Sequence, residues 1–443
     1  MKLFKNLYVD GRLFQAVSAL VVLFVLGYFY PVVFVVAKAL FFVFVAAVAV
    51  DAALLFKTRE GVFARRAMAD KLSNGDENEI RIFLENHYGF KTALTVIDEL
   101  PFQFQMRDSF YKVALESEAK HVVTYSVRPV RRGEYSFGAV NVYAASPIGL
   151  LLKRYRFDNN ALVPVYPSYL QLRKYELLAI SNRLMDAGIK KVRKIGRTME
   201  FDQVRDYVQG DDYRTVNWLA TARRQKLMVN QYQDEKSQQV YCIIDKGRTM
   251  KMPFAGMSLL DYAINTSLVM SNVAILKDDR AGLVTFSHKP GILLPAEKRR
   301  SQMQKIMEIL YNQKTRYLES NFEMLYATVR RQITQYSLLL LFTNFESLSA
   351  LERQLPFLKS LAKHHLLVVI FFENTELHDL ALKPAITTEE VYNKTIAEQF
   401  IFEKKVIVKE LERHGIQAIL TAPENLTVNT INKYLELKAR RMI

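Results

Sequence analysis

The stretch VYCIIDKGRTM, residues 240–250, decides the fold of the larger part of this chain. An unbroken apolar run, Val240–Ile244, ends at a carboxylate, Asp245, and Gly247 and Thr249 follow at every second position. A run that is apolar on both faces is typical of a strand inside a parallel sheet. A carboxylate followed by small residues at this spacing is one way in which α/β domains hold magnesium, but Gly247 lacks the hydroxyl that such a loop uses.

Further apolar runs alternate with amphipathic stretches along the rest of the chain. The other predicted strands are Ala281–Phe286, Leu338–Phe342, Leu366–Phe372 and Ala418–Leu420. The predicted helices are Leu259–Leu276, Glu297–Tyr311, Phe322–Thr334, Ala350–Ala362, Glu389–Glu412 and Val428–Arg440. This alternation predicts that residues 240–443 form a Rossmann-like, doubly wound α/β domain, a parallel sheet covered by helices on both faces.

The N-terminal region predicts a transmembrane helical hairpin over residues 13–56. Between Leu13 and Phe56 the only charged residues are Lys38 and Asp51, and the run is long enough for two spans of about 20 residues. The predicted helices, Leu13–Tyr30 and Val32–Phe56, meet at the sequence GYFYP. A cleaved signal peptide would be shorter, and a buried core hairpin would carry more polar residues.

The basic residues on both sides of the hairpin predict its orientation. They place the tail (residues 1–12) and the basic linker (residues 57–76) in the cytoplasm, so we expect a multi-pass protein of the inner, cytoplasmic membrane with its soluble domains facing the cytoplasm. After the linker, residues 77–166 alternate with period two between frequent turns, which predicts an antiparallel β-sandwich.

The composition limits the choice of partners. The formal net charge of +16 favours an anionic partner, such as membrane lipid or an acidic protein. Nucleic acid is a second alternative that rests on charge alone, and none is expected because no nucleic-acid-binding module is recognisable. The single cysteine, Cys242, excludes an intramolecular disulfide.

The connecting segment, residues 167–239, contains the most specific pattern of the chain, KIGRTMEFDQVRDYVQGDDYRTVNWLATARRQKLMVNQYQDE at 194–235. It resembles the signature of the domain of unknown function 58 family. The residues that carry the resemblance are Gly196, Glu200, Phe201, Arg205, Tyr207, Gly210, Asp211, Arg214, Trp218, Ala220, Ala222, Arg223 and Glu235. We expect these residues to be structural: Gly210 and its neighbours form a capping turn, Arg214, Arg223 and Glu235 form salt bridges to the sheet, and Trp218 plugs the joint.

A second resemblance concerns the loop that follows the first buried strand. Asp245, Gly247 and Thr249 resemble the metal-ion-dependent adhesion motif of von Willebrand factor A-like domains with one serine lost. Ser320 would stand for its threonine and Asn344 for its second aspartate. Together the two resemblances imply a membrane anchor, a β domain and a degenerate A-like domain. They also imply that the chain works with MoxR-type AAA+ ATPases and A-domain proteins in chaperone-like maturation or envelope stress tolerance.

The residues themselves favour a site without a metal cofactor. Asp245 is the one obvious charged ligand and therefore a weak metal candidate, and Lys246 and Arg248 stand beside it. Their positive charges repel a divalent cation, and either could pair with the carboxylate instead. We therefore predict a protein-interaction scaffold with no catalytic residues and no magnesium. The alternative is a metal-dependent hydrolase that uses Asp245, Ser320 and Glu346.

Overall fold

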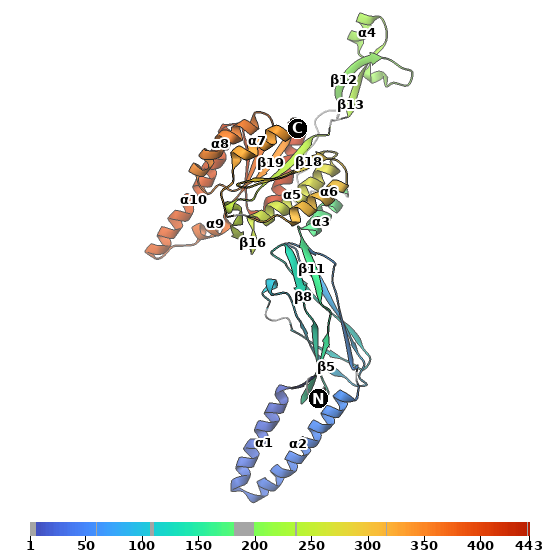
Figure 1. The fold of residues 1–443 in the computed structure, drawn as a ribbon, viewed down its shortest axis with the longest axis vertical. Helices are drawn as coiled ribbons and strands as arrows, with labels where there is room; N and C mark the ends of the chain where they lie inside the picture. The colour runs from blue at the N-terminus through green and yellow to red at the C-terminus, as the bar shows by residue number, and fades with distance from the viewer. Residues whose placement is uncertain are drawn as a thin grey trace. The chain divides into compact units, whose positions relative to one another are not determined.

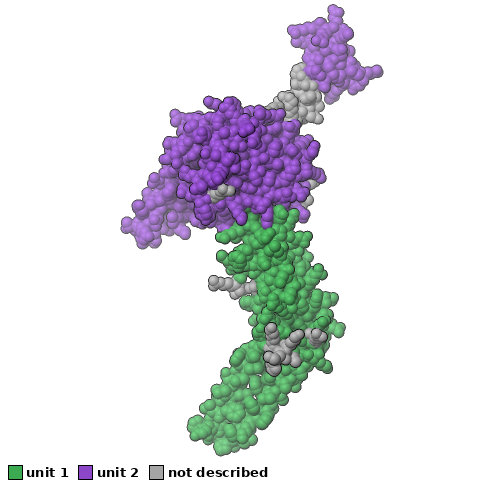
Figure 2. Space-filling model, viewed as in Figure 1, with its two compact units in different colours: residues 1–166 green, residues 167–443 purple. Residues whose placement is uncertain are grey.

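The computed structural model describes residues 6–58, 60–106, 110–180, 199–234, 237–315, 317–440 and 442–443. The chain divides into two compact units, residues 1–166 and residues 167–443 (Figure 2). The first unit has one hydrophobic core, and the second has two, one on each face of its main sheet.

The N-terminal residues form two antiparallel apolar helices, α1 (Gly11–Phe29) and α2 (Pro31–Lys57), as predicted (Figure 1). Both are long and apolar enough to cross a membrane, which indicates a membrane anchor. Asp10 caps the start of α1, and Pro31 begins α2, where its missing N–H costs nothing. A Cβ atom at Gly27 would lie 2.9 Å from the Cα atom of Phe34, so this glycine allows the helices to meet closely.

The rest of the first unit consists of mostly antiparallel sheets. One sheet has the order β1-β10-β9-β5-β6, a second β2-β4-β7 and a third β3-β11-β8, in which only the β3–β11 pair is parallel. The strands are β1 (Leu7–Val9), β2 (Val62–Ala67), β3 (Leu72–Ser73), β4 (Asn78–Asn86), β5 (Thr92–Asp98), β6 (Phe110–Leu115), β7 (Lys120–Val127), β8 (Gly133–Phe137), β9 (Val140–Ala145), β10 (Leu151–Phe157) and β11 (Ala161–Tyr166). One core joins side chains from all three sheets.

Two predicted segments are parts of these sheets instead. The predicted tail (1–12) contains β1, and the predicted basic linker (57–76) contains β2 and β3. The structure places β2 and β3 where the sequence predicted a basic linker, and the basic residues of this segment are not all exposed. Arg66 is buried, and its guanidinium pairs with the carboxylate of Asp98 and donates to the carbonyl of Gly138 at 2.9 Å.

Helix α2 is fastened to the sheets by its own polar groups. Asp51 is fully buried and accepts hydrogen bonds from the amides of Leu150 at 2.9 Å and Leu151 at 2.8 Å, and from the Ser146 hydroxyl. At the end of α2 the buried Lys153 ammonium donates to the carbonyls of residues 55 and 58, at 3.0 and 2.7 Å. A cation at a helix C-terminus satisfies carbonyls that have no partner within the helix.

The second unit is built on a six-stranded sheet with the order β18-β17-β14-β19-β20-β21. Its strands are β14 (Gln239–Asp245), β17 (Arg280–Phe286), β18 (Pro290–Glu297), β19 (Leu338–Phe342), β20 (Leu366–Phe372) and β21 (Gln417–Thr421). All neighbours are parallel except the edge strand β18, which runs antiparallel to β17. The prediction of a purely parallel sheet missed β18, because its half-exposed residues lack the continuous apolar run of a buried strand.

Helices cover both faces of this sheet (Figure 1). One core contains α5 (Leu259–Leu276), α6 (Ser301–Tyr311) and α11 (Leu426–Ala439), and the other contains α7 (Phe322–Gln332), α8 (Leu348–Ala362) and α10 (Thr388–Arg413). The unit also has α3 (Tyr169–Ile180), α9 (Thr375–Leu382) and the short pair β15 (Pro253–Phe254) and β16 (Met257–Ser258). Helix α5 is apolar enough to span a membrane, yet it is the central core helix, since 83% of its most apolar window is buried.

A separate two-stranded ribbon occupies residues 199–234. It consists of β12 (Met199–Asp206) and β13 (Met228–Asp234), which pair antiparallel. Between them lie a 3₁₀ turn (Tyr213–Thr215) and α4 (Trp218–Arg224), capped by Asp212 and Asn217.

Candidate functional site at the carboxyl edge of the sheet

Polar residues follow β14 and β19, the two neighbouring strands at the topological switch point of the second unit's sheet. From this point successive strands are added on opposite sides. Strands β14 and β19 are neighbours, but β14 is followed by β17 on one side and β19 by β20 on the other. Open α/β sheets bind ligands at such a switch point, beyond the carboxyl ends of the strands. Asp245 is the last residue of β14, and Thr343 and Asn344 directly follow β19.

Asp245 is the centre of a closed hydrogen-bond cluster. Its side chain is only 2% exposed, and one carboxylate oxygen accepts from the amide of Gly247 at 2.8 Å and from the Ser320 hydroxyl. The other oxygen accepts from the Thr343 hydroxyl at 2.7 Å. Burial raises the pKa of Asp245, and these three donors oppose that shift by stabilising the charged form. Each carboxylate oxygen therefore already has a protein donor.

Position 247 is occupied by glycine because the side chain of Ser320 fills the space that a larger residue would need. A Cβ atom at position 247 would lie 2.2 Å from the Oγ atom of Ser320 and 3.1 Å from a carboxylate oxygen of Asp245. The hydroxyl that the loop lacks at position 247 is thus supplied by a residue 73 positions later. The sequence predicted that Ser320 and Asp245 belong together, but it did not single out Thr343, the third donor.

The remaining predicted site residues lie differently. Thr249 is half-buried in the 3₁₀ turn Arg248–Lys251, and within the described part of the chain its hydroxyl makes no hydrogen bond to Asp245. The Lys246 ammonium donates to the side-chain oxygen of Gln313 at 3.0 Å, and Arg248 is exposed.

A lysine from a distant helix reaches Asn344. The Lys404 ammonium, from α10, donates to the side-chain oxygen of Asn344 at 2.7 Å and to the carbonyl of Phe345. Lys404 is half-buried, and its burial lowers its pKa to about 8, while the charge of Glu346 acts in the opposite direction. No sequence pattern pointed to this residue, because 60 positions separate it from Asn344.

A cavity of about 330 Å³ opens beside Asn344 and Lys404. Its apolar walls come from the loop after β14, the end of β20, helices α9 and α10 and the loop after β21, and its polar lining is Asn344, Glu346, Glu373, Asn374 and Lys404. The apolar lining residues are Met252, Pro253, Phe254, Leu259, Phe372, Leu377, Phe400, Ile401 and Pro423. Specific ligand sites commonly combine such apolar walls with a few convergent polar groups.

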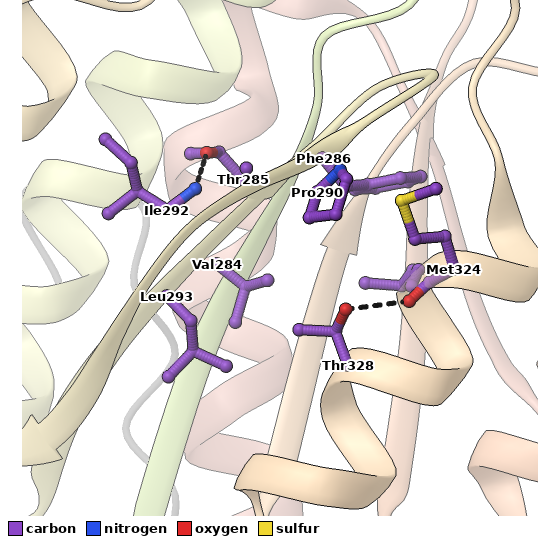
Figure 3. Close-up of a pocket in the computed structure, with 10 residues that line it drawn as sticks. Val284, Thr285, Phe286, Pro290, Ile292, Leu293, Met324 and Thr328 are labelled. Atoms are coloured by element: carbon purple, nitrogen blue, oxygen red, sulfur yellow. Dashed lines mark hydrogen bonds between the residues drawn. The ribbon is translucent and has the colours of Figure 1, made fainter.

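Two other hollows are weaker candidates. The first, between β17, β18 and α7, holds about 10 Å³, and its Thr285 and Thr328 hydroxyls already bond to backbone atoms (Figure 3). That volume suits no more than about one water molecule. The second, of about 270 Å³, contains Arg330, His364 and His365, and burial lowers the pKa of His365. Among the residues that the structure describes, no group of three or more His, Cys, Asp or Glu side chains could hold a metal ion.

The signature residues lie in the ribbon. Arg205 grips the carboxylate of Asp211 with two hydrogen bonds of 2.7 and 2.8 Å, and Gly210 has a φ of +112°, which a side chain would strain. The predicted plug was wrong: Trp218 is 72% exposed, because a two-stranded ribbon has too little apolar surface to bury it.

The other signature residues have these positions. Glu200 and Phe201 belong to β12, Tyr207 is half-buried, Arg214 and Arg223 are exposed, and Gly196 and Glu235 lie outside the described residues. Within the described residues of the ribbon, Arg205 and Asp211 form an ion pair. The predicted ion pairs of Arg214 and Arg223 with the sheet are not seen among these residues.

Comparison with known proteins gives a family and one relative. Residues 203–387 match the model of a family described as "Protein of unknown function DUF58". Over 126 residues the chain is 27% identical to the "Uncharacterized protein YeaD" of Bacillus subtilis (strain 168). This alignment covers 28% of the chain and 31% of the relative, so the chain spans about a third of that protein.

Two solved structures show distant likenesses to part of this chain. The ASH / PapD-like domain of human CEP192 is 15% identical, with a TM-score of 0.19, over 24% of this chain and 87% of that one. The CARDB domain of the PF1109 protein from Pyrococcus furiosus is 16% identical, with a TM-score of 0.17, over 24% of this chain and 86% of that one. These scores are too low to support an argument about fold or function.

Proposed function

We propose that this chain is a membrane-anchored scaffold that binds another protein. The proposal rests on the geometry of the chain itself, because the chain belongs to the domain of unknown function 58 family, to which no activity is assigned. The binding site is the cavity at the carboxyl edge of the six-stranded sheet. The apolar helices α1 and α2 anchor the chain in the inner membrane, and the parts of the chain outside these helices face the cytoplasm, as the basic residues on both sides of the hairpin predict.

The cavity is the observation that carries this proposal. It is large enough for one or two side chains, it has mostly apolar walls, and it lies at the switch point of a doubly wound sheet. Beside it Asp245 is buried and bonded to three donors, which suits a supporting role and not proton transfer. We therefore do not assign a catalytic residue.

We further propose that the α/β domain is a degenerate von Willebrand factor A-like domain that works without a metal ion. In chain order its strands are arranged 3-2-1-4-5-6, and Asp245, Ser320 and Thr343 gather at the edge where such a domain binds its ligand. Lys404 brings a positive charge to Asn344, so the ammonium offers a cation where the resemblance implies a metal.

The resemblance to this family supplies the partner to be tested first, a MoxR-type AAA+ ATPase. The complex would act in chaperone-like maturation or in envelope stress tolerance. The full chain in nanodiscs is mixed with a purified MoxR-type ATPase, with and without ATP, and binding is measured by surface plasmon resonance. We expect Phe400→Asp, in the cavity wall, to weaken binding at least about tenfold.

A matched control separates the cavity from surface charge in general. Phe102→Asp makes the same change at an 85% exposed residue of the first unit, and it should leave binding unchanged. Equal effects of both variants, or binding that neither changes, would remove the cavity from the proposal.

Metal dependence is tested separately. Titration of the full chain with magnesium and manganese should give no saturable binding below about 1 mM, the weak end of protein affinities for such ions. Tight binding that disappears in Asp245→Ala would instead support the metal-dependent hydrolase.

A further inference from the structure

Two surfaces of residues 167–443 expose large apolar side chains and carry opposite charge. We name the first the ribbon tip; its exposed apolar residues are Val208, Tyr213, Trp218, Leu219 and Leu227. We name the second the helical arm; its exposed apolar residues, on α9, the following loop and the start of α10, are Leu380, Leu382, Ile386, Val391 and Tyr392. Clustered exposed apolar residues usually mark a surface that binds a partner.

The ribbon tip is basic. Residues 207–228 contain four cationic side chains, Arg214, Arg223, Arg224 and Lys226, and two carboxylates, Asp211 and Asp212, which leaves a net charge of +2. All four cations are exposed. The Asp211 carboxylate is paired with Arg205, and Asp212 accepts from a backbone amide, so the cations dominate the charge that a partner meets.

The helical arm is acidic, although the whole chain carries +16. Residues 375–400 contain Glu376, Asp379, Glu389, Glu390 and Glu398 against Lys383 and Lys394, which leaves a net charge of −3. Helix α10 extends well beyond the helices that cover the sheet (Figure 1), so its first half has few neighbours to cover it. Ile386, two residues before α10 begins, is 90% exposed.

We propose that the ribbon tip of one copy docks on the helical arm of a second copy. The charges select this pairing: tip against tip would oppose cations to cations, and arm against arm would oppose carboxylates to carboxylates. Tip against arm joins opposite charges around an apolar centre that includes Trp218. Such a head-to-tail contact between unlike surfaces propagates along the membrane plane into a ring or a row. Helices α9 and α10 contribute to both the arm and the cavity, but none of the apolar residues that define the tip and the arm lines the cavity, so variants of these surfaces can be tested separately from the proposed function.

The single tryptophan of the chain reports on this contact directly. For the full chain in detergent, we expect the emission of Trp218 to be that of an exposed indole when dilute, and to move to shorter wavelength as concentration rises. Sedimentation over the same concentrations should show growing assemblies, and high salt should reverse both changes. An unchanged monomer at all concentrations would overturn the proposal.

Charge exchange gives the matched controls. Arg223→Glu and Glu389→Arg each place like charges in the contact, so each alone should weaken assembly at least about tenfold. The two variants mixed together, or combined in one chain, should recover it, which misfolding could not produce. Failure of this rescue would overturn the pairing of tip and arm.

Cross-linking tests whether the contact lies between copies. One population carries Leu219→Cys, another carries Ile386→Cys, and a short bis-maleimide joins them when mixed. The native Cys242 is buried with its pKa raised to about 12, so it should not compete. We expect 219–386 dimers and none when Phe102→Cys replaces Ile386→Cys. A third sample carries both cysteines in one chain. If cross-links form only within that chain, the contact does not lie between copies and the proposal is contradicted. Binding of the tip to anionic vesicles without self-association would also contradict it.

Discussion

Replacement of Gly247 with alanine tests the idea that the missing hydroxyl of this loop comes from Ser320. The backbone at Gly247 has a φ of −71°, which alanine adopts freely, so any cost must come from contact. The new methyl group would lie 2.2 Å from the Oγ atom of Ser320 and force that hydroxyl away from Asp245. A hydrogen bond to a charged group is worth about 1.5–3 kcal/mol, and overpacking adds about 1–3 kcal/mol.

A double-mutant cycle separates the two contributions. Ser320→Ala should cost about 1.5–3 kcal/mol, since it removes the same hydrogen bond without a clash. Gly247→Ala combined with Ser320→Ala should cost no more than Ser320→Ala alone, because the methyl group then enters the space that the hydroxyl left. The cycle should therefore show a coupling of at least about 1.5 kcal/mol. Gly247→Ser with Ser320→Ala should recover part of the loss by returning a hydroxyl.

The assay is hydrogen exchange of the full chain in detergent, followed by mass spectrometry on peptides that contain β14. Local opening free energies of this strand report on the cluster at its end. Gly89→Ala is the control, since a Cβ atom there meets no other atom within 4 Å, and exchange in β14 should not change. Additive costs for the two alanine substitutions, or a harmless Gly247→Ala, would refute the reasoning.

Three further predictions concern other buried polar groups. The pKa of Lys404 falls from 10.5 to about 8 on folding, so at this group the unfolded chain binds more protons between these values. In denaturant titrations the stability of the wild-type chain relative to Lys404→Met should therefore rise from pH 8 to 10, a comparison that cancels the opposite contribution of Cys242, whose pKa folding raises. Asp51→Leu leaves the amides of Leu150 and Leu151 without an acceptor, which should lower the unfolding free energy by about 1–3 kcal/mol for each amide. The hydrogen exchange of these two amides should become faster in Asp51→Leu, and less so in Asp51→Asn, which keeps an acceptor oxygen. Thr343→Val should lower the unfolding free energy by about 1.5–3 kcal/mol, and Thr343→Ser by much less.

The helices and strands with continuous apolar patterns could be predicted from the sequence. Leu259–Leu276 and Leu366–Phe372 were placed at the residues where the structure has them, because burial on every side leaves an unbroken apolar run. The edge strand β18 could not be found this way. Strand β18 has a neighbouring strand on one side only, so its side chains are exposed or half-buried. Its sequence therefore shows neither a continuous apolar run nor a clear alternation of apolar and polar residues.

The sequence could predict where the candidate site lies, because the ends of the strands can be predicted, but it could not predict the contacts between its side chains. The chain order of the strands brings Asp245 and Thr343 to one edge, and the sequence therefore located the site. It could not show that Ser320 fills the space beside Gly247, since that depends on how two distant loops pack: a Cβ atom at position 247 would lie 2.2 Å from the Oγ atom of Ser320. Nor could it show Lys404, whose approach to Asn344 is set by the packing of a whole helix.

Basic residues were the least predictable part of the chain, and the reason bears on how its charge should be used. A net charge of +16 suggests a positive surface, but Arg66 is held inside by a carboxylate, and Lys153 and Lys404 by carbonyl or amide oxygens. What a partner meets is the local sign of the exposed groups: basic on the ribbon and acidic on the arm, whose −3 opposes the total. An acidic partner drawn by the total charge would be repelled by the arm, so the arm requires a basic one. The ribbon tip of another copy has that charge and an apolar centre, and every copy in the membrane presents it.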